Sequence, residues 1–191
     1  MKPTDEEWAR WAANETSPAE TTYLNILNTY LIDTSGYRHI QQTQPLTLAY
    51  LANDSPLGFA LWIYALMRGA IDPRTSSWTP DELITFSLMY TIQGPYGGFR
   101  TYKEMYREGE FQGNGLGVSP FVTQPVGVTQ NPYDIAFGLP LDWARRQGNV
   151  QAIYQHKFGG HFAAYKDTEG LLQDVYRWFG DRELSGTAVF F

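Results

Sequence analysis

The sequence predicts an α/β protein made of a helical region and a shorter β–α–β–α segment. Helix-start signals and apolar residues at helical spacing recur up to about residue 110, whereas two β-branched runs occur only after residue 120. A helical stretch separates these two runs, and such a β–α–β unit forms parallel strands. The expected organisation is a helical region at 1–110, a glycine-rich linker at 111–120 and the α/β segment at 121–191.

Two helix starts open the helical region. Thr4 stands before three acidic residues that suit a first turn. Ser17 is followed by a proline at the first helical position and by Glu20, three residues after the serine. The second of these helices should end near Gly36. Residues 36–45 are polar and close with a proline, so they are expected to form a loop.

Two further starts follow in the helical region. Ser55, next to a proline, begins the apolar stretch 57–67, which is too short to cross a bilayer and is interpreted as a buried helix. Thr79 is followed by a proline and two acidic residues and begins another helix. The pair Gly97-Gly98 is expected to break the chain before a last helical stretch at 101–106.

The α/β segment contains two strand-like runs, at 125–129 and 150–154, with a helical stretch at 140–147 between them. A final helix is expected at 168–179. Two parallel strands are a poor sheet alone, because parallel sheets are normally buried on both faces. Association into a homo-oligomer, a complementing N-terminal polypeptide, or the apolar tail 187–191 laid along the edge would each protect it.

Composition excludes several classes of protein. Of the 191 residues 43% are hydrophobic, which suffices for a packed core, and a formal net charge of −6 argues against nucleic acid as a partner. With no cysteine, the sequence has no disulfide and no thiol chemistry, and its three histidines lack the spacing of a metal site. No metal or other cofactor is expected. Residues 1–7 lack the apolar core of a signal peptide, so we expect a soluble, cytoplasmic chain without a membrane span.

Five motifs occur in order along the chain. They are GYRHIQQTQPLTLAY at 36–50 with NDSPLG at 53–58, FRTYKE at 99–104, PVGV at 125–128, NPYD at 131–134 and GGHFAA at 159–164. In this order and spacing they resemble the lid and the last part of the core of the microsomal-type epoxide hydrolases, which belong to the α/β-hydrolase superfamily. The resemblance implies a partial α/β-hydrolase fold, a helical lid followed by the C-terminal part of the core.

The resemblance also implies a set of site residues. Family members use a histidine as general base, a carboxylate that supports it, and two lid tyrosines that hydrogen-bond the epoxide oxygen. On this sequence the base would be His161, its partner Asp134, and the tyrosine pair Tyr37 and Tyr102. An apolar small-molecule epoxide is the implied substrate.

Properties of the residues themselves favour the same assignment. His161 follows two glycines after the second strand-like run, and Asp134 follows the first. Because adjacent parallel strands end on the same side of a sheet, we expect the two side chains to be hydrogen-bonded neighbours. Asp134 capping its own turn is the competing interpretation, Asp142 is the main competitor as partner, and His156 is interpreted as structural. A core role competes for each tyrosine, since the chain has 13 of them.

The family's nucleophile motif is not found in the sequence. No Gly-Gly-Asp-Trp-Gly type turn and no His-Gly-x-Pro loop occurs in it. Three hypotheses therefore stand. The His–Asp pair activates water directly while the tyrosines activate the epoxide; or the chain is a half-enzyme that needs a separate N-terminal polypeptide carrying the nucleophile; or it is a truncated product without activity.

Overall fold

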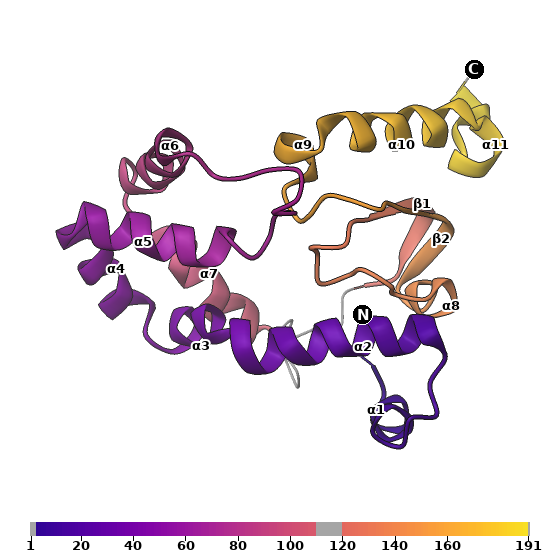
Figure 1. Ribbon diagram of the computed structural model, residues 1–191, viewed down its shortest axis with the longest axis horizontal. Coiled ribbons are helices and arrows are strands. Elements are labelled where there is room, and N and C mark those ends of the chain that lie inside the picture. The colour runs from indigo at the N-terminus through magenta and orange to yellow at the C-terminus, as the bar shows by residue number, and fades with distance from the viewer. Residues whose placement is uncertain (1–2, 110–119, 191) are drawn as a thin grey trace. The chain divides into compact units, whose positions relative to one another are not determined.

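Figure 1 shows the computed structural model, which describes residues 3–109 and 120–190. These residues group into two compact units. The strand unit takes the chain up to Asn28, the segment Ala70–Thr75 and the C-terminal part from residue 120, and the helical unit takes the rest. The grouping therefore places the first helices with the C-terminal segment, whereas the sequence placed them with the helical region. Of the linker expected at 111–120, all but Pro120 lies outside the described residues.

The strand unit contains one β–α–β unit and the helices around it. Its strands are β1 (Val122–Gln130) and β2 (Gly148–Gln155), and its helices are α1 (Asp5–Ala12), α2 (Pro18–Thr29), α8 (Leu141–Ala144), α9 (Ala163–Lys166), α10 (Thr168–Gly180) and α11 (Arg182–Ser185), followed by a 3-10 turn at Thr187–Phe190. The strands pair in parallel, with Val126 opposite Val150, and α8 lies beside them (Figure 1). This confirms the predicted α/β class and the parallel pairing.

Large apolar side chains hold the strand unit together. Trp143 of α8 is 2% exposed and meets Tyr23 of α2 edge to face, with ring centroids 5.9 Å apart. On β1, a Cβ added at Gly127 would lie 2.8 Å from the ring of Trp178 on α10. Glycine at this position therefore lets the helix lie directly against the strand.

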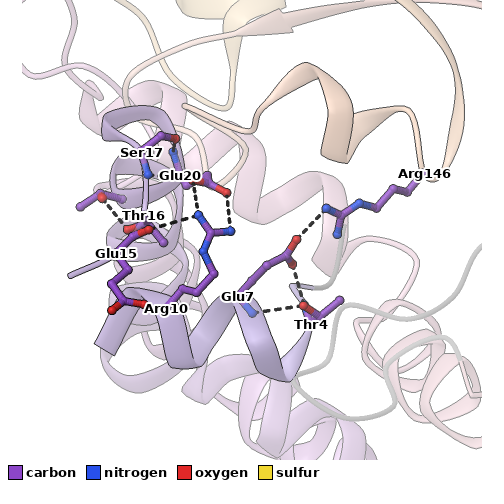
Figure 2. A network of polar contacts seen from close by, with 9 residues as sticks. Thr4, Glu7, Arg10, Glu15, Thr16, Ser17, Glu20 and Arg146 are labelled. Carbon is purple, nitrogen blue, oxygen red and sulfur yellow. Dashed lines mark hydrogen bonds and ion pairs between the residues drawn. The ribbon is translucent and has the colours of Figure 1, made fainter. Parts of the chain in front are cut away.

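A polar network around α1 ties the N-terminus into the strand unit (Figure 2). Glu7 accepts a hydrogen bond from Arg146 at 2.6 Å and also closes the capping box with Thr4. Arg10 reaches the carboxylate of Glu20, which in turn caps the start of α2. The predicted starts of both helices are confirmed, and their capping glutamates serve a second time as ion-pair partners.

The helical unit consists of a π-helical turn at Tyr30–Thr34 and the helices α3 (Gly36–Thr43), α4 (Pro45–Asp54), α5 (Pro56–Met67), α6 (Pro80–Thr91) and α7 (Tyr96–Arg107). Helix α7 packs against both α3 and α4. Phe99 of α7 is buried and meets Phe59 of α5 edge to face at 6.0 Å. The helix starts predicted at Ser55 and Thr79 are confirmed by their side-chain caps. None of the helices in the described part of the chain is long and apolar enough to cross a membrane.

The loop predicted at 36–45 is wrong, because most of this stretch is helix α3. Its polarity was misleading: Arg38, Gln41 and Gln42 are buried in the fold. The proline does act as predicted at the end of the stretch. Gln44 leaves the helical conformation (φ −130°, ψ 43°), since a following proline disfavours it.

Three other local predictions are also corrected. The break expected at Gly97-Gly98 is absent, since both residues lie inside α7, and the turn precedes them at Gly94, whose φ is +82°. Helix α5 is buried on one face only, with Leu57 71% exposed. The tail does not extend the sheet, because Thr187–Phe190 forms a 3-10 turn and the described strands are β1 and β2 alone.

Candidate functional site

His161 and Asp134 lie together in the strand unit, each in the turn that follows a parallel strand. His161 Nδ1 lies 2.7 Å from Asp134 Oδ2. The other carboxylate oxygen accepts the backbone N–H of Ala136 at 2.9 Å, so both oxygens have a partner. Asp142, the competing partner, lies in the first turn of α8. The pairing expected from the topology is thus present, and the imidazole leaves its Nε2 free of this bond.

Each group of the pair favours the charged form of the other. Burial alone would raise the pKa of Asp134, but the hydrogen bonds from His161 and from the Ala136 N–H outweigh it, and the net pKa is lowered. The hydrogen bond to Asp134 raises the pKa of His161 against the opposing effect of its partial burial. The imidazole is 61% exposed and the carboxyl only 23%, so the histidine is the accessible member of the pair.

The backbone around His161 is fixed by contacts with the turn that carries Asp134. Tyr133 N–H donates to the carbonyl of Gly159 at 3.1 Å, and the side-chain amide of Asn131 donates to the carbonyl of Gly160. Gly159 has a φ of +93°, a backbone conformation that residues other than glycine rarely adopt. Gly159 and Gly160 therefore form the turn whose backbone is hydrogen-bonded to the residues that follow β1.

A second histidine–carboxylate pair lies nearby in sequence but has a different setting. His156 Nε2 lies 2.7 Å from Asp174 Oδ2 of α10, and the same oxygen accepts the hydroxyl of Thr129 at 2.8 Å. Both side chains of the pair are largely buried. The pair links the ends of both strands to α10, which fits the structural role expected for His156. Asp174 was not found from the sequence, because an acid on a helix is usually a solvent-exposed residue.

The predicted tyrosines meet in the helical unit. The rings of Tyr37 on α3 and Tyr102 on α7 lie 6.0 Å apart at 80°. A third phenol joins them, since the hydroxyl of Tyr30 lies 3.2 Å from that of Tyr37. Burial first, and then the hydrogen bond with Tyr30, raise the pKa of Tyr37, and burial likewise raises the pKa of Tyr102. Both phenols are therefore neutral hydrogen-bond donors over the whole physiological pH range.

Tyr30 lies in the π-helical turn before α3. Its spacing placed it on the apolar face of the preceding helix, and it was not predicted as a member of the site. The helical unit thus presents a tyrosine cluster and the strand unit a histidine–aspartate pair. That these face one common cavity stays a prediction. Among residues 3–109 and 120–190, no group of three or more histidine, aspartate or glutamate side chains is placed to hold a metal ion.

Comparison with known proteins connects this chain with enzymes that act on epoxides. No family model matches it. Epoxide hydrolase 1 of Sus scrofa is 30% identical over 164 residues, which cover 78% of this chain and 35% of that protein. A putative epoxide hydrolase of Stigmatella aurantiaca is 32% identical over 169 residues, covering 85% of this chain and 36% of the relative. The chain therefore spans about a third of the length of these relatives.

Solved structures show the same likeness at the level of fold. The juvenile hormone epoxide hydrolase of Bombyx mori matches with a TM-score of 0.76 at 21% identity, over 95% of this chain and 47% of that one. The epoxide hydrolase of Aspergillus niger matches with a TM-score of 0.68 at 23% identity, over 92% of this chain and 41% of that one. At such identities the match establishes the fold and leaves the chemistry to be argued from the side chains.

Proposed function

We propose that this chain, a relative of the epoxide hydrolases that carries part of the α/β-hydrolase fold, opens apolar epoxides by general-base catalysis. The observation that carries the proposal is the 2.7 Å hydrogen bond between His161 Nδ1 and Asp134 Oδ2. A carboxylate on Nδ1 holds the proton there and leaves Nε2 as the basic nitrogen. It also stabilises the imidazolium that forms once the base has accepted a proton.

In the proposed reaction His161 removes a proton from water as the water oxygen attacks an epoxide carbon. One carbon–oxygen bond forms, one bond of the three-membered ring breaks, and the ring oxygen becomes an alkoxide. The proton taken by the base is returned to solvent, and the alkoxide takes up a proton, so that water and epoxide together give a diol. No protein nucleophile takes part in this route.

Tyr37 and Tyr102 would stabilise the opening oxygen. Two neutral phenols that donate to the same oxygen become more effective as its negative charge grows, which is the condition for lowering a barrier. The support for this role is their edge-to-face contact and the raised pKa of both phenols, which keeps the donor protons in place. The apolar character of the substrate rests on the family resemblance of the sequence motifs alone.

The alternative is a non-catalytic half-enzyme that binds a separate N-terminal polypeptide carrying the nucleophile, or that associates with itself. Two observations favour it. The chain spans about a third of the length of its relatives. In the described residues the sheet has two parallel strands, and β1 begins with the exposed side chain of Val122. Parallel strands normally have more neighbours than this.

Hydrolysis of an aryl-substituted epoxide such as styrene oxide in heavy-oxygen water tests the proposal. The wild-type chain should accelerate diol formation, and the first turnover should place solvent oxygen in the diol. His161→Gln should lower the rate by about 100-fold or more, the usual contribution of a general base. His156→Gln is the matched control and should retain most of the rate, because this histidine pairs with Asp174 instead.

Two results would contradict this route. Oxygen taken from the protein in the first turnover would show a covalent mechanism. A wild-type chain that gives no rate above buffer, but becomes active when mixed with the N-terminal part of a relative, would establish the half-enzyme alternative.

A further inference from the structure

The turn before His161 is held by a distant piece of chain, the segment Ala70–Thr75 between α5 and α6. This segment belongs to the strand unit although the helices on both sides of it belong to the helical unit. The backbone N–H of His161 donates to the carbonyl of Ala70 at 2.9 Å. The contact is close, since a Cβ added at Gly160 would lie 2.5 Å from the same carbonyl oxygen. The segment therefore packs directly on the histidine turn.

One side chain of this segment, Asp72, points its carboxylate into the turn. The side chain is fully buried, and one of its oxygens accepts the backbone N–H of Gly159 at 3.2 Å. Arg74 holds the same carboxylate through Nε at 2.9 Å and Nη2 at 2.7 Å, and its backbone N–H adds a third bond. The hydrogen bonds from Arg74, more than its charge, lower the pKa of Asp72 to about 2 against the effect of burial. The acceptor is therefore ionised at any working pH.

Arg74 extends the hold to the rest of the turn. Its Nη2 also donates to the carbonyl of Lys157 at 3.0 Å. Its guanidinium lies over the ring of Phe158 at 5.0 Å and near the ring of Tyr133 at 5.8 Å. The Asp72–Arg74 pair thus touches both the turn that leads to His161 and the turn that leads to Asp134.

Gly159 is the residue at which these contacts meet. Its N–H is held by Asp72, and its carbonyl accepts the N–H of Tyr133, the residue before Asp134. His161 follows two residues later. The φ of +93° at Gly159 keeps the N–H pointing to Asp72 and the carbonyl pointing to Tyr133. One buried carboxylate is therefore bonded to the residue that connects the turns of both members of the pair.

We propose that Asp72 is the positioning residue of the His161–Asp134 pair, acting through the N–H of Gly159 and supported by Arg74. The catalytic consequence rests on the function proposed above, but the positioning itself does not. The bonds of Asp72 that carry this role go to the backbone of Gly159 and to Arg74. Its effect is to keep the two turns at the relative position that gives the 2.7 Å hydrogen bond between His161 and Asp134.

Histidine ring resonances in two-dimensional NMR spectra test this without any substrate. Asp72→Asn replaces one carboxylate oxygen by an NH2 group, which donates and cannot accept. The variant therefore loses either the bonds from Gly159 and from Nη2 of Arg74, or the bonds from the backbone N–H and Nε of Arg74, and in both cases the turn should loosen. The titration midpoint of His161 should then fall towards its ordinary value, and the signal of its Nδ1–H should broaden or disappear. Asp174→Asn is the matched control, since it removes the other buried carboxylate that pairs with a histidine. It should change the resonances of His156 and leave those of His161 in place.

A second variant covers the case that Asp72→Asn does not fold. Arg74→Gln keeps the bond from Gly159 to Asp72 but removes the guanidinium that contacts Lys157 and Phe158. The titration midpoint of His161 should therefore move in the same direction by a smaller amount. A folded Asp72→Asn variant, or failing that Arg74→Gln, with a wild-type His161 titration would overturn the proposal.

Kinetics then separate this inference from the proposed function. If the wild type hydrolyses epoxide, Asp72→Asn should lower kcat much more than it changes KM, because the base is displaced and the substrate contacts are kept. A wild type without turnover whose His161 midpoint still responds to Asp72→Asn would refute the proposed function and support the positioning role.

Discussion

Replacing Gly160 by alanine gives a sharp test of how closely the segment Ala70–Thr75 packs on the histidine turn. The added Cβ would lie 2.5 Å from the carbonyl oxygen of Ala70 and 2.9 Å from the Cα of Ile71, where ordinary contacts begin at 3.4 Å. Both neighbours are backbone atoms and cannot turn aside as a side chain could. We expect a loss of about 1–3 kcal/mol in the free energy of unfolding, the usual cost of overpacking.

The chain offers a matched substitution with the opposite sign. Gly98 lies inside α7, and a Cβ there meets nothing within 4 Å. Alanine at this position should stabilise the helix by about 0.5–1 kcal/mol, because glycine has the greater freedom to lose on folding.

Urea unfolding of both variants against the wild type measures the difference. With a slope of about 2 kcal/mol per molar, the midpoint should fall by about 0.5–1.5 M for Gly160→Ala and rise by about 0.3–0.5 M for Gly98→Ala. A Gly160→Ala variant as stable as the wild type would refute the close contact. Equal losses in both variants would show that alanine is simply not tolerated in place of glycine in this chain.

Two further predictions concern the titratable groups of the candidate site. The pKa of Asp134 is lowered from 3.8, so the pairing of this carboxyl stabilises the fold above pH 3.8 and the stabilisation is lost as the pH falls through the folded-state pKa. The pKa of His161 is raised from 6.5, so the pairing of this imidazole stabilises the fold below pH 6.5 and the stabilisation is lost as the pH rises through the folded-state pKa. Asp134→Asn should therefore cost most stability between these two values, and a thermal midpoint difference from the wild type that does not vary with pH would contradict the pairing. Tyr30→Phe should lower the pKa of Tyr37, because it removes a hydrogen bond that raises it, and should leave the helical content unchanged. Carbon NMR titration of ring-labelled tyrosine checks this, and an unmoved Tyr37 would exclude Tyr30 as its partner.

Local signals in the sequence were sufficient for much of the fold. Thr4, Ser17 and Thr79 cap their helices with partners three residues away, so the pattern could be read within a single turn. The parallel strands followed from an equally short pattern. The helix α3 did not, because Arg38 and its polar neighbours are buried by parts of the chain that no local window contains.

The same distinction applies to the candidate site. The bond between Asp134 and His161 could be predicted because parallel strands bring the turns after their ends to one edge. Asp72 is bonded to Arg74 nearby, but its bond to Gly159 spans 87 residues, and nothing near it in the sequence indicates that it is buried. Asp174 and His156 come from a helix and a strand end, whose packing no pattern in the sequence predicts.

The interleaved order of the two units has a consequence for the way the chain is made. The contacts of the helical unit join helices α3 to α7, which leave the ribosome one after another, so this unit can complete its packing before the strand unit does. The strand unit needs α2 from the beginning of the chain, the segment Ala70–Thr75 from the middle, and β2 and α10 from the end. The histidine turn can therefore reach its final geometry only after β2 and the turn that follows it have emerged, and α1 and α2 must wait for these partners in the meantime.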